Sequence, residues 1–396
     1  MTERLYYDDA YLWEFDAAVT SVKNGKRPGE WEVTLDRSAF YPTSGGQPFD
    51  TGTISFGKIK AKVTNVEVGP EGEVIHTVDR EIPAGTAVHG EIDGVRRTDH
   101  MEQHSGEHML AGAIWEKLGG TTIGLHLGQT ESSIDVAMPD RWTRLTDEET
   151  AMLEDTVNGR IRMDAPIRCW FPGEEELKQL PLRKAPTVTE HVRIVAMGDF
   201  EMVACGGTHP SSTGRIGLLK IISAIPAKGK IRVSFVCGGR AVRLFRTYMR
   251  CADKAGAALS CPPEKLSVAA AELKYRLSEA EKRANKLETR EILKQMEEAG
   301  EELKGLTLCV MILPETDGRA VTAAVSEYIG AAGRIILLAA GERLTFARSA
   351  DVKADMNELI KRVARGGGRP DMASGAGIPE CVGVAKKILI TEGICG

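Results

Sequence analysis

His104-Ser-Gly-Glu-His108 and Cys205-Gly-Gly-Thr-His209 each place two metal-binding side chains four positions apart. The first stretch lies in residues 98–118, which the sequence predicts as a helix, where positions i and i+4 are one turn apart on the same face. The second lies in a Gly-Gly loop between two apolar runs, where the backbone can turn Cys205 and His209 toward one point. Three imidazoles and one thiolate are a ligand set that suits tetrahedral zinc.

His100 leaves the choice of ligands open, because His100, His104 and His108 recur at positions i, i+4 and i+8. The outer two are about 12 Å apart along a helix axis at 1.5 Å per residue, so the residues alone permit either adjacent pair. A single His-x-x-x-His pair is more often surface or core chemistry, and the Cys-Gly-Gly-Thr-His loop is what favours a metal. Glu107, inside the motif, is a candidate general base by analogy with zinc hydrolases, but a solvated glutamate on the helix face is the more ordinary interpretation.

Length and composition indicate a globular protein of about two to four domains. The chain has 396 residues, eight cysteines without regular spacing and a net charge of −5. We therefore expect the reduced thiols of a cytoplasmic protein. The charged amino terminus lacks an apolar h-region, and no apolar run approaches the ~20 residues of a membrane span. Nucleic-acid binding would have to rest on local basic patches, such as the one in residues 228–250, for which a solvated face is the alternative.

The first half of the chain divides by pattern into two segments. Residues 1–92 are strand-like, rich in β-branched residues and bounded by Gly, Pro and Asp. They contain the stretch Leu35 to Asp50, in which Ser38 and Gln47 are neutral hydrogen-bonding groups near two glycines. Such groups suit a pocket for a small polar substrate, although an ordinary Pro- and Gly-containing turn is the alternative. Residues 93–240 mix helices and strands, which predicts an α+β domain that holds the metal-binding motifs.

The second half also divides in two. Residues 241–305 are helical, with a break at Pro262-Pro263 and a narrow coiled-coil-like seam from Leu273 to Leu287. Residues 306–396 return to α/β and contain a Gly-rich run, Gly366 to Gly377. We expect this run to be a loop whose open N–H groups could receive phosphate. It matches neither a Walker A loop nor a dinucleotide fingerprint.

These motifs together resemble a known family. The Leu35 to Asp50 stretch and the two metal-binding motifs resemble the editing region of alanyl-tRNA synthetase and of its free-standing relatives, the AlaX proteins. The Gly366 to Gly377 run resembles the carboxy-terminal DHHA1 domain of those synthetases, which is also found on DHH-type phosphoesterases. The resemblance covers essentially the whole chain, in the order of the long AlaX form.

The resemblance implies a multidomain α+β fold with four parts. These are a small β-barrel domain with the Gly-rich motif (1–92), a zinc-binding editing domain of the threonyl/alanyl-tRNA synthetase second additional domain type (93–240), a helical hairpin or coiled-coil spacer (241–305) and an α/β DHHA1-type tRNA-binding domain (306–396).

The resemblance also implies the site residues. The zinc ligands that it implies are His104, His108, Cys205 and His209. Gln47 matches a glutamine in the pocket wall, and Ser38 stands where the family usually has threonine, whose hydroxyl is associated with recognising the mischarged amino acid. We therefore expect Gln47 and Ser38 to be the catalytic residues. The implied tRNA-binding residues are Gly366, Gly367, Gly368 and Arg369.

The implied activity is that of a zinc-dependent deacylase acting on mischarged tRNA(Ala), chiefly the seryl ester, with the glycyl ester as a second candidate. Serine differs from alanine by one hydroxyl and glycine by one methyl, differences that a single apolar pocket rejects poorly, so a second hydrolytic site is needed. Nothing upstream of the β unit could hold the activating core of a synthetase, so we expect no aminoacylation. A homodimer through the carboxy-terminal helices and the DHHA1 domain is plausible.

Three alternatives remain at this stage. A DHH-type phosphoesterase lacks support because the nearest approach to an Asp-His-His motif is Asp99-His100-Met101. A non-catalytic tRNA-binding module would use zinc only to hold the fold. A detached piece of a split synthetase would need a partner chain.

Overall fold

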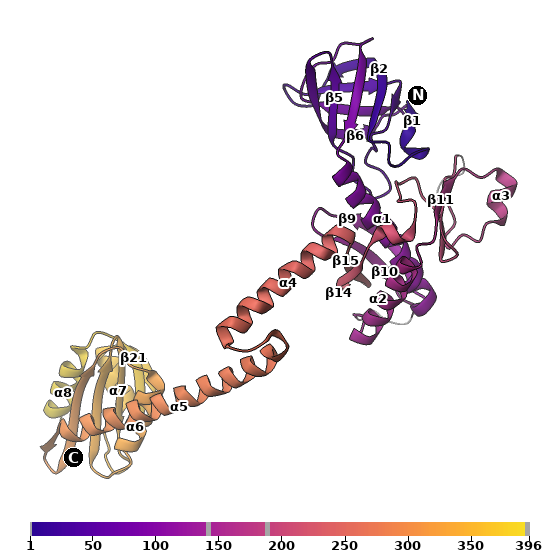
Figure 1. The fold of residues 1–396 in the computed structure, drawn as a ribbon. Coiled ribbons are helices and arrows are strands. Elements are labelled where there is room, and N and C mark those ends of the chain that lie inside the picture. The colour runs from indigo at the N-terminus through magenta and orange to yellow at the C-terminus, as the bar shows by residue number, and fades with distance from the viewer. Residues whose placement is uncertain (1, 140–143, 187–190, 393–396) are drawn as a thin grey trace. The chain divides into compact units, whose positions relative to one another are not determined.

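The computed structural model describes residues 2–139, 144–186 and 191–392, which fold into two compact units, Met1–Cys251 and Ala252–Gly396 (Figure 1). No helix in these ranges is long and apolar enough to cross a membrane. The division into four domains remains a prediction.

The first segment forms a closed six-stranded barrel, which confirms the predicted barrel. Around the barrel its strands are β2 (Glu14–Asn24), β3 (Trp31–Leu35), β7 (Val74–Val78), β6 (Ile59–Val68), β5 (Gly52–Phe56) and β8 (Ala87–Ile92). Neighbouring strands are antiparallel. Alternate residues point inward, so that Val33, Leu35 and Ile54 belong to an apolar core. A short strand, β1 (Glu3–Arg4), pairs in parallel with β4 (Arg37–Ser38).

Helix α1 (Gly94–Leu118) follows the barrel directly and carries the first metal-binding motif. The Asp93 side chain caps its first turn by accepting a hydrogen bond from Arg96 N, and Gly119 ends it with a φ of 67°. The helix therefore starts four residues before the predicted 98. Most of its residues from 97 to 114 are buried, so the motif lies inside the first unit and not on its surface.

Two sheets pack around α1. The four-stranded antiparallel sheet has the order β14 (Leu219–Ala227), β15 (Lys230–Cys237), β10 (Ser132–Ala137) and β9 (Thr121–Leu127). The three-stranded sheet has the order β11 (Ile167–Trp170), β12 (Ile194–Met197) and β13 (Glu201–Ala204). Helices α2 (Asp147–Arg162) and α3 (Glu174–Gln179) complete this part. Thr146 caps α2 by forming a capping box with Glu149.

The predicted helical segment consists of α4 (Gly238–Leu259) and α5 (Leu266–Glu298), with the break at Pro262-Pro263 as expected. The seam residues lie on α5, where Leu273, Leu277 and Leu287 are each more than half exposed.

The second unit contains a six-stranded sheet. Its order is β16 (Gly300–Leu303), β17 (Leu306–Leu313), β18 (Arg334–Ala340), β19 (Arg343–Arg348), β21 (Met372–Ala376) and β20 (Arg365–Gly368). Strands β17 and β18 are parallel, and the other pairs are antiparallel. The carboxy-terminal part of α5 packs with α6 (Gly318–Tyr328) on one face, and α7 (Met356–Val363) and α8 (Cys381–Thr391) cover the other (Figure 1).

The Gly366 to Gly377 run is not the open loop that we expected. Its first three glycines belong to β20 and pair with β21, so the run forms a hairpin at the edge of the sheet. A Cβ on Gly366 would lie 2.5 Å from the Cα of Gly375, so glycine is required here by the close approach of two strands. Arg369 lies in the exposed turn of this hairpin, 3.2 Å from the carboxylate of Asp371. The role of these residues in tRNA binding remains a prediction.

Candidate metal centre

Helix α1 and the loop after β13 bring the two motifs together. The ligand atoms of His104, His108, Cys205 and His209 all lie within 4.8 Å of one another. His100 is not in this cluster, so the structure selects the second of the two histidine pairs. The i, i+4 spacing stacks the rings of His104 and His108 with centroids 4.9 Å apart, and the loop adds its two ligands from the other side.

The four donors fit a tetrahedral zinc ion. Cys205 Sγ is 3.4 Å from Nε2 of both His104 and His209. Zn–N and Zn–S bonds of about 2.0 and 2.3 Å at a tetrahedral angle would place nitrogen and sulfur about 3.5 Å apart. The buried Nε2 of His108 has no hydrogen-bond partner among the described residues, which is the state expected of an atom reserved for a metal.

Two of the three imidazoles form a hydrogen bond through Nδ1, and His108 has a carboxylate at ion-pair distance from this atom without a hydrogen bond to it. His104 Nδ1 donates to Gln47 Oε1 at 2.8 Å, and His209 Nδ1 lies 2.8 Å from the hydroxyl of Ser105. A carboxylate oxygen of Glu107 is 3.0 Å from His108 Nδ1. These contacts orient the rings so that Nε2 faces the centre, as the outer-shell partners of metal-binding histidines generally do.

Glu107 is therefore not the solvated glutamate that we considered the more ordinary interpretation. It is 4% exposed, because α1 packs against α2 and strands of both sheets and is buried throughout residues 103–114. Burial raises the pKa of its carboxyl, but His108 outweighs this effect and keeps the pKa below its usual value. A carboxylate at this position supplies negative charge to the ring of His108.

Electrostatics favour the metal-binding form of Cys205. Burial raises the pKa of this thiol, but the three imidazoles, His104 foremost, lower it well below its usual value. Burial lowers the pKa of His209 to about 3, which keeps this ring neutral. Burial also lowers the pKa of His108, but Glu107 and Cys205 outweigh it and raise that pKa well above its usual value. A metal ion would take the place of the proton that balances the thiolate.

The Cys205 loop is shaped by contacts that the sequence motif does not reveal. Arg193 donates to the carbonyl oxygens of Gly207 at 2.7 Å and Cys205 at 3.2 Å, and its guanidinium lies over the Tyr7 ring. Gly207 N donates to Cys205 Sγ at 3.4 Å. Gln47 binds Thr208 twice, with its Oε1 accepting from Thr208 N and its Nε2 donating to Thr208 Oγ1. Gln47 therefore connects the barrel to both metal-binding motifs.

The sequence matches two described families in this unit. Residues 2–96 match tRNA synthetases class II (A), and residues 192–234 match the Threonyl and Alanyl tRNA synthetase second additional domain. The alanyl-tRNA editing protein AlaX-L of Pyrococcus horikoshii is 31% identical over 403 residues, which cover 95% of this chain and 94% of that protein. The chain belongs to the AlaX-L family.

Alanine–tRNA ligases are similar over part of their length. Those of Pyrococcus furiosus and Pyrococcus abyssi are 36% and 33% identical, over 72% and 94% of this chain but only 31% and 42% of the ligases. This AlaX-L family member therefore spans less than half the length of the ligases that it matches.

The two residues that the family resemblance implies as catalytic lie in different surroundings. Gln47 is fully buried and contacts His104, as described above. Ser38 is also fully buried, but its hydroxyl lies 2.8 Å from His76 Nε2 and accepts from Phe40 N. Burial lowers the pKa of His76 to about 4, so this ring is neutral. Within the described residues, Ser38 makes no hydrogen bond to a metal ligand.

Sequence reasoning missed four residues of the site, namely Ser105, Glu107 as a buried carboxylate, Arg193 and Thr208. Ser105 and Thr208 lie inside the two motifs, next to His104 and His209. Their positions in the sequence could therefore have indicated that they belong to the site. Arg193 has no sequence signal, because only the pairing of β12 with β13 brings it beside Cys205.

Gly207 offers a test of the site's geometry. A Cβ on Gly207 would lie 2.3 Å from His104 Cε1 and 2.8 Å from Gln47 Oε1, whereas a Cβ on Gly206 would meet only the Tyr7 hydroxyl at 3.5 Å. We expect Gly207→Ala to displace His104 and to lower zinc affinity about 10- to 100-fold, the usual effect of disturbing the outer shell. Gly206→Ala is the matched control, with near-native affinity in a competitive chelator titration. Equal affinities of the two variants would contradict this packing argument.

Proposed function

We propose that this chain hydrolyses mischarged tRNA(Ala), chiefly Ser-tRNA(Ala) and also Gly-tRNA(Ala), with the help of zinc held by the His104, His108, Cys205 and His209 cluster. The observation that carries the proposal is that family membership with an alanyl-tRNA editing protein coincides with a converged set of three imidazoles and one thiolate. In the hydrolysis, water oxygen bonds to the ester carbonyl carbon, the bond to the ribose oxygen breaks, and that oxygen takes up a proton.

Zinc, when bound, would supply positive charge that favours the polar end of the substrate and the developing oxyanion. The chain's own residues prepare the site. Gln47, Ser105 and Glu107 hold the Nδ1 side of the three rings, and Arg193 fixes the carbonyls of the Cys205 loop. The Tyr41 ring is 2% exposed, and its pKa is raised first by burial and then by Cys205, so this hydroxyl stays neutral.

We further propose a role in this hydrolysis for each of the four predicted domains. Residues 93–240 would be the zinc-binding editing domain, with Gln47 and Ser38 contributed by the barrel of 1–92. Residues 241–305 would be the spacer, and residues 306–396 a DHHA1-type domain that contacts tRNA through Gly366 to Arg369. Dimerisation through this last part is a separate proposal, supported by the exposed leucines of α5.

A non-catalytic tRNA-binding role is the second candidate. It is favoured by one observation, that all four donors come from the protein, which is typical of closed, structural zinc sites.

Deacylation assays separate the two candidates. We expect the native protein to hydrolyse seryl-tRNA(Ala) rapidly and the glycyl ester measurably, while it spares the alanyl ester. His104→Ala should lose both bound zinc and activity. His89→Ala is the matched control, since His89 is a partly exposed barrel residue away from the cluster, and it should keep both. A folded, zinc-replete native protein without hydrolytic activity would refute the deacylase and favour the binding role.

A further inference from the structure

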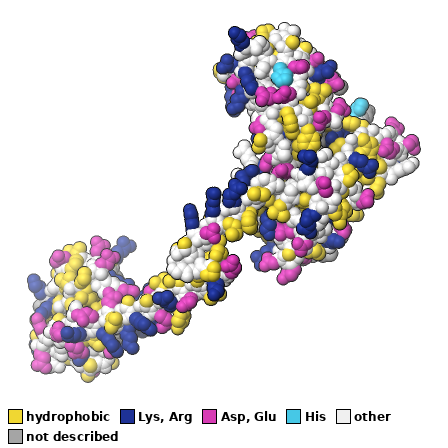
Figure 2. Space-filling view, in the orientation of Figure 1, with side chains coloured by type: hydrophobic (Ala, Val, Ile, Leu, Met, Phe, Trp, Pro, Cys, Tyr) yellow, Lys and Arg dark blue, Asp and Glu magenta, His cyan; other side chains and the backbone are white. Residues whose placement is uncertain are grey.

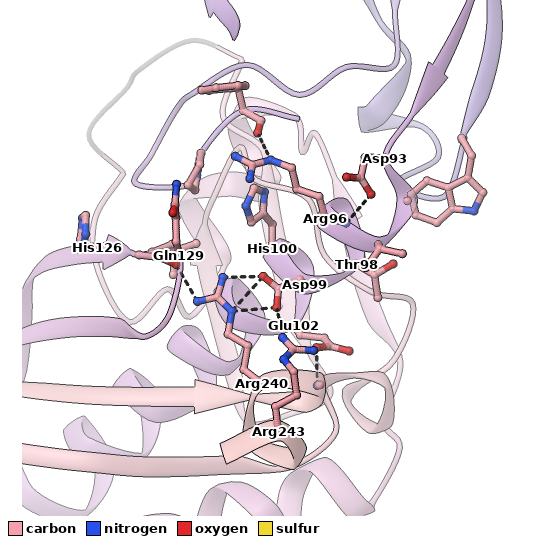
Figure 3. A pocket seen from close by; sticks show the side chains of 18 residues that line it. Asp93, Arg96, Thr98, Asp99, His100, Glu102, His126, Gln129, Arg240 and Arg243 are labelled. Carbon is pink, nitrogen blue, oxygen red and sulfur yellow. Dashed lines mark hydrogen bonds and ion pairs between the residues drawn. The ribbon is translucent and has the colours of Figure 1, made fainter. Parts of the chain in front are cut away.

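A cavity of about 1280 Å³ lies in the first unit. It is lined by the amino-terminal half of α1, the segment after Gln47, the end of β9 and the start of α4 (Figure 3). Two of its lining segments lead along the chain to residues of the metal centre. Pro48 and Phe49 directly follow Gln47, and His100 is one helical turn, about 6 Å along the axis, before His104.

The cavity contains a buried polar side chain without a partner. His100 is 4% exposed, and its Nδ1 has no hydrogen-bond partner among the described residues. Burial, assisted by Arg96, lowers its pKa to about 4, so the ring is neutral. A neutral imidazole with a free nitrogen in a cavity can bind one polar edge of a ligand without adding charge.

Aromatic and guanidinium surfaces lie around this histidine. Arg96 donates through Nε to the carbonyl of Phe49, and its guanidinium lies over the Phe49 ring at 5.3 Å. Trp13 lines the opposite edge, next to the start of α1. Rings and planar guanidinium groups are the surfaces on which unpaired RNA bases stack.

The start of α4 is anchored at the rim of the cavity. Arg240 binds the carboxylate of Asp99 through Nε and Nη2, and its Nη1 donates to the carbonyl of Gly128 at 2.7 Å (Figure 3). Glu102 accepts from Gly239 N, so this carboxylate is also engaged. The partners of Asp99 and Glu102 reduce the acidic character of the cavity.

An arginine ridge continues from the cavity along α4, and we define it as Arg243, Arg246 and Arg250. At 3.6 residues per turn these positions fall within about 60° of one another around the helix. All three are exposed, and Figure 2 shows Lys and Arg side chains gathered along this helix. Within the described part of the chain, Arg246 and Arg250 have no carboxylate at ion-pair distance. Arg243 is 3.7 Å from the carboxylate of Asp99, so the unpaired cations of the ridge are Arg246 and Arg250. Two such cations on a chain of net charge −5 indicate a polyanionic ligand.

We propose that the cavity and the arginine ridge form one track for the single-stranded 3′ end of an RNA, in which the cavity takes unstacked bases and the ridge contacts phosphates. This proposal rests on the proposed function, because it identifies how the RNA part of the substrate reaches the metal centre.

The test uses an RNA hairpin without an amino acid, with either a short single-stranded 3′ overhang or a blunt end. We expect the full-length zinc-bound protein to bind the overhang hairpin about tenfold more tightly. Arg96→Ala and His100→Gln should each remove most of this preference and leave zinc content unchanged. Because the hairpin carries no ester, the result does not depend on hydrolysis, so failure of the deacylase proposal would be seen separately.

The ridge is tested by salt dependence. Arg246→Glu with Arg250→Glu should weaken binding of both hairpins and lower the slope of log affinity against log salt by about 1.4, since two phosphate contacts are lost. The matched control is Lys58→Glu with Arg80→Glu, which changes the net charge equally at exposed barrel positions and should leave the slope near native.

Two binding outcomes would overturn the track, and a cross-linking outcome would do so independently. One is equal binding of overhang and blunt hairpins by the native protein, and the other is a ridge variant that matches its control. Cross-linking of a photoreactive base in the overhang to the native protein needs no variant. Cross-links to Trp13, Phe49 or His100 are expected, and cross-links confined to the second unit would overturn the proposal.

Discussion

Cys205→Ser is expected to abolish zinc binding and, with it, deacylation. Cys205 Sγ lies at 3.4 Å from two of the three imidazole Nε2 atoms, and its thiolate supplies the negative charge of the cluster. A serine hydroxyl stays protonated at neutral pH and is a poor zinc ligand. The loss of affinity should exceed the roughly 10- to 100-fold effect of removing an outer-shell partner.

The measurement is zinc per protein after dialysis against a chelator, together with hydrolysis of seryl-tRNA(Ala). Cys169→Ser is the matched control, because Cys169 lies in the neighbouring sheet and packs against the same core without belonging to the cluster. Burial raises the pKa of Cys169, so it is a neutral thiol whose replacement should leave zinc content intact. Retention of zinc by Cys205→Ser would contradict the proposed ligand set.

Asp50→Ala is expected to cost about 3–5 kcal/mol of unfolding free energy, because it leaves a buried guanidinium without its counter-charge. Asp50 and Arg97 are both fully buried and form an ion pair. Arg97 also donates to the carbonyls of Ala10 and Ala39, and Asp50 accepts from Tyr41 N at 2.7 Å. The ion pair connects α1 to the stretch that carries Gln47, which contacts the ligand His104. Loss of the pair in Asp50→Ala should therefore lower zinc affinity as well.

Denaturant unfolding of the zinc-bound protein checks this expectation. The matched control is Asp50→Ala combined with Arg97→Met, which removes both charges and should recover much of the lost stability, since the buried cation is then absent. If the single and double variants were equally destabilised, packing and not charge would explain the loss.

Much of the site was predictable from local patterns. The spacing of His104 and His108 puts both rings on one helical face wherever a helix forms, and Thr146 caps α2 through atoms only three residues away. The richness of residues 1–92 in β-branched side chains, with Gly, Pro and Asp at the boundaries, likewise predicted strands in this segment. Membership of an editing family was visible in the order of the motifs.

Other features depend on segments that are distant in the sequence. Which histidine pair converges with Cys205, and the burial of Glu107, depend on the sheets and the helix α2 that pack against α1. The Ser38 hydroxyl lies within hydrogen-bond distance of His76, which is 38 residues away in the sequence. Gly366 lies in a strand because β20 pairs with β21.

The sequence by itself determined the candidate donors, the helix that bears the histidine series and the strand-forming character of residues 1–92, because local spacing and propensity are enough to specify them. Only the tertiary structure decided which donors meet, which polar groups hold them from behind, and that a cavity with an arginine ridge opens beside them. The reason is that burial and long-range contacts arise when segments a hundred residues apart pack together.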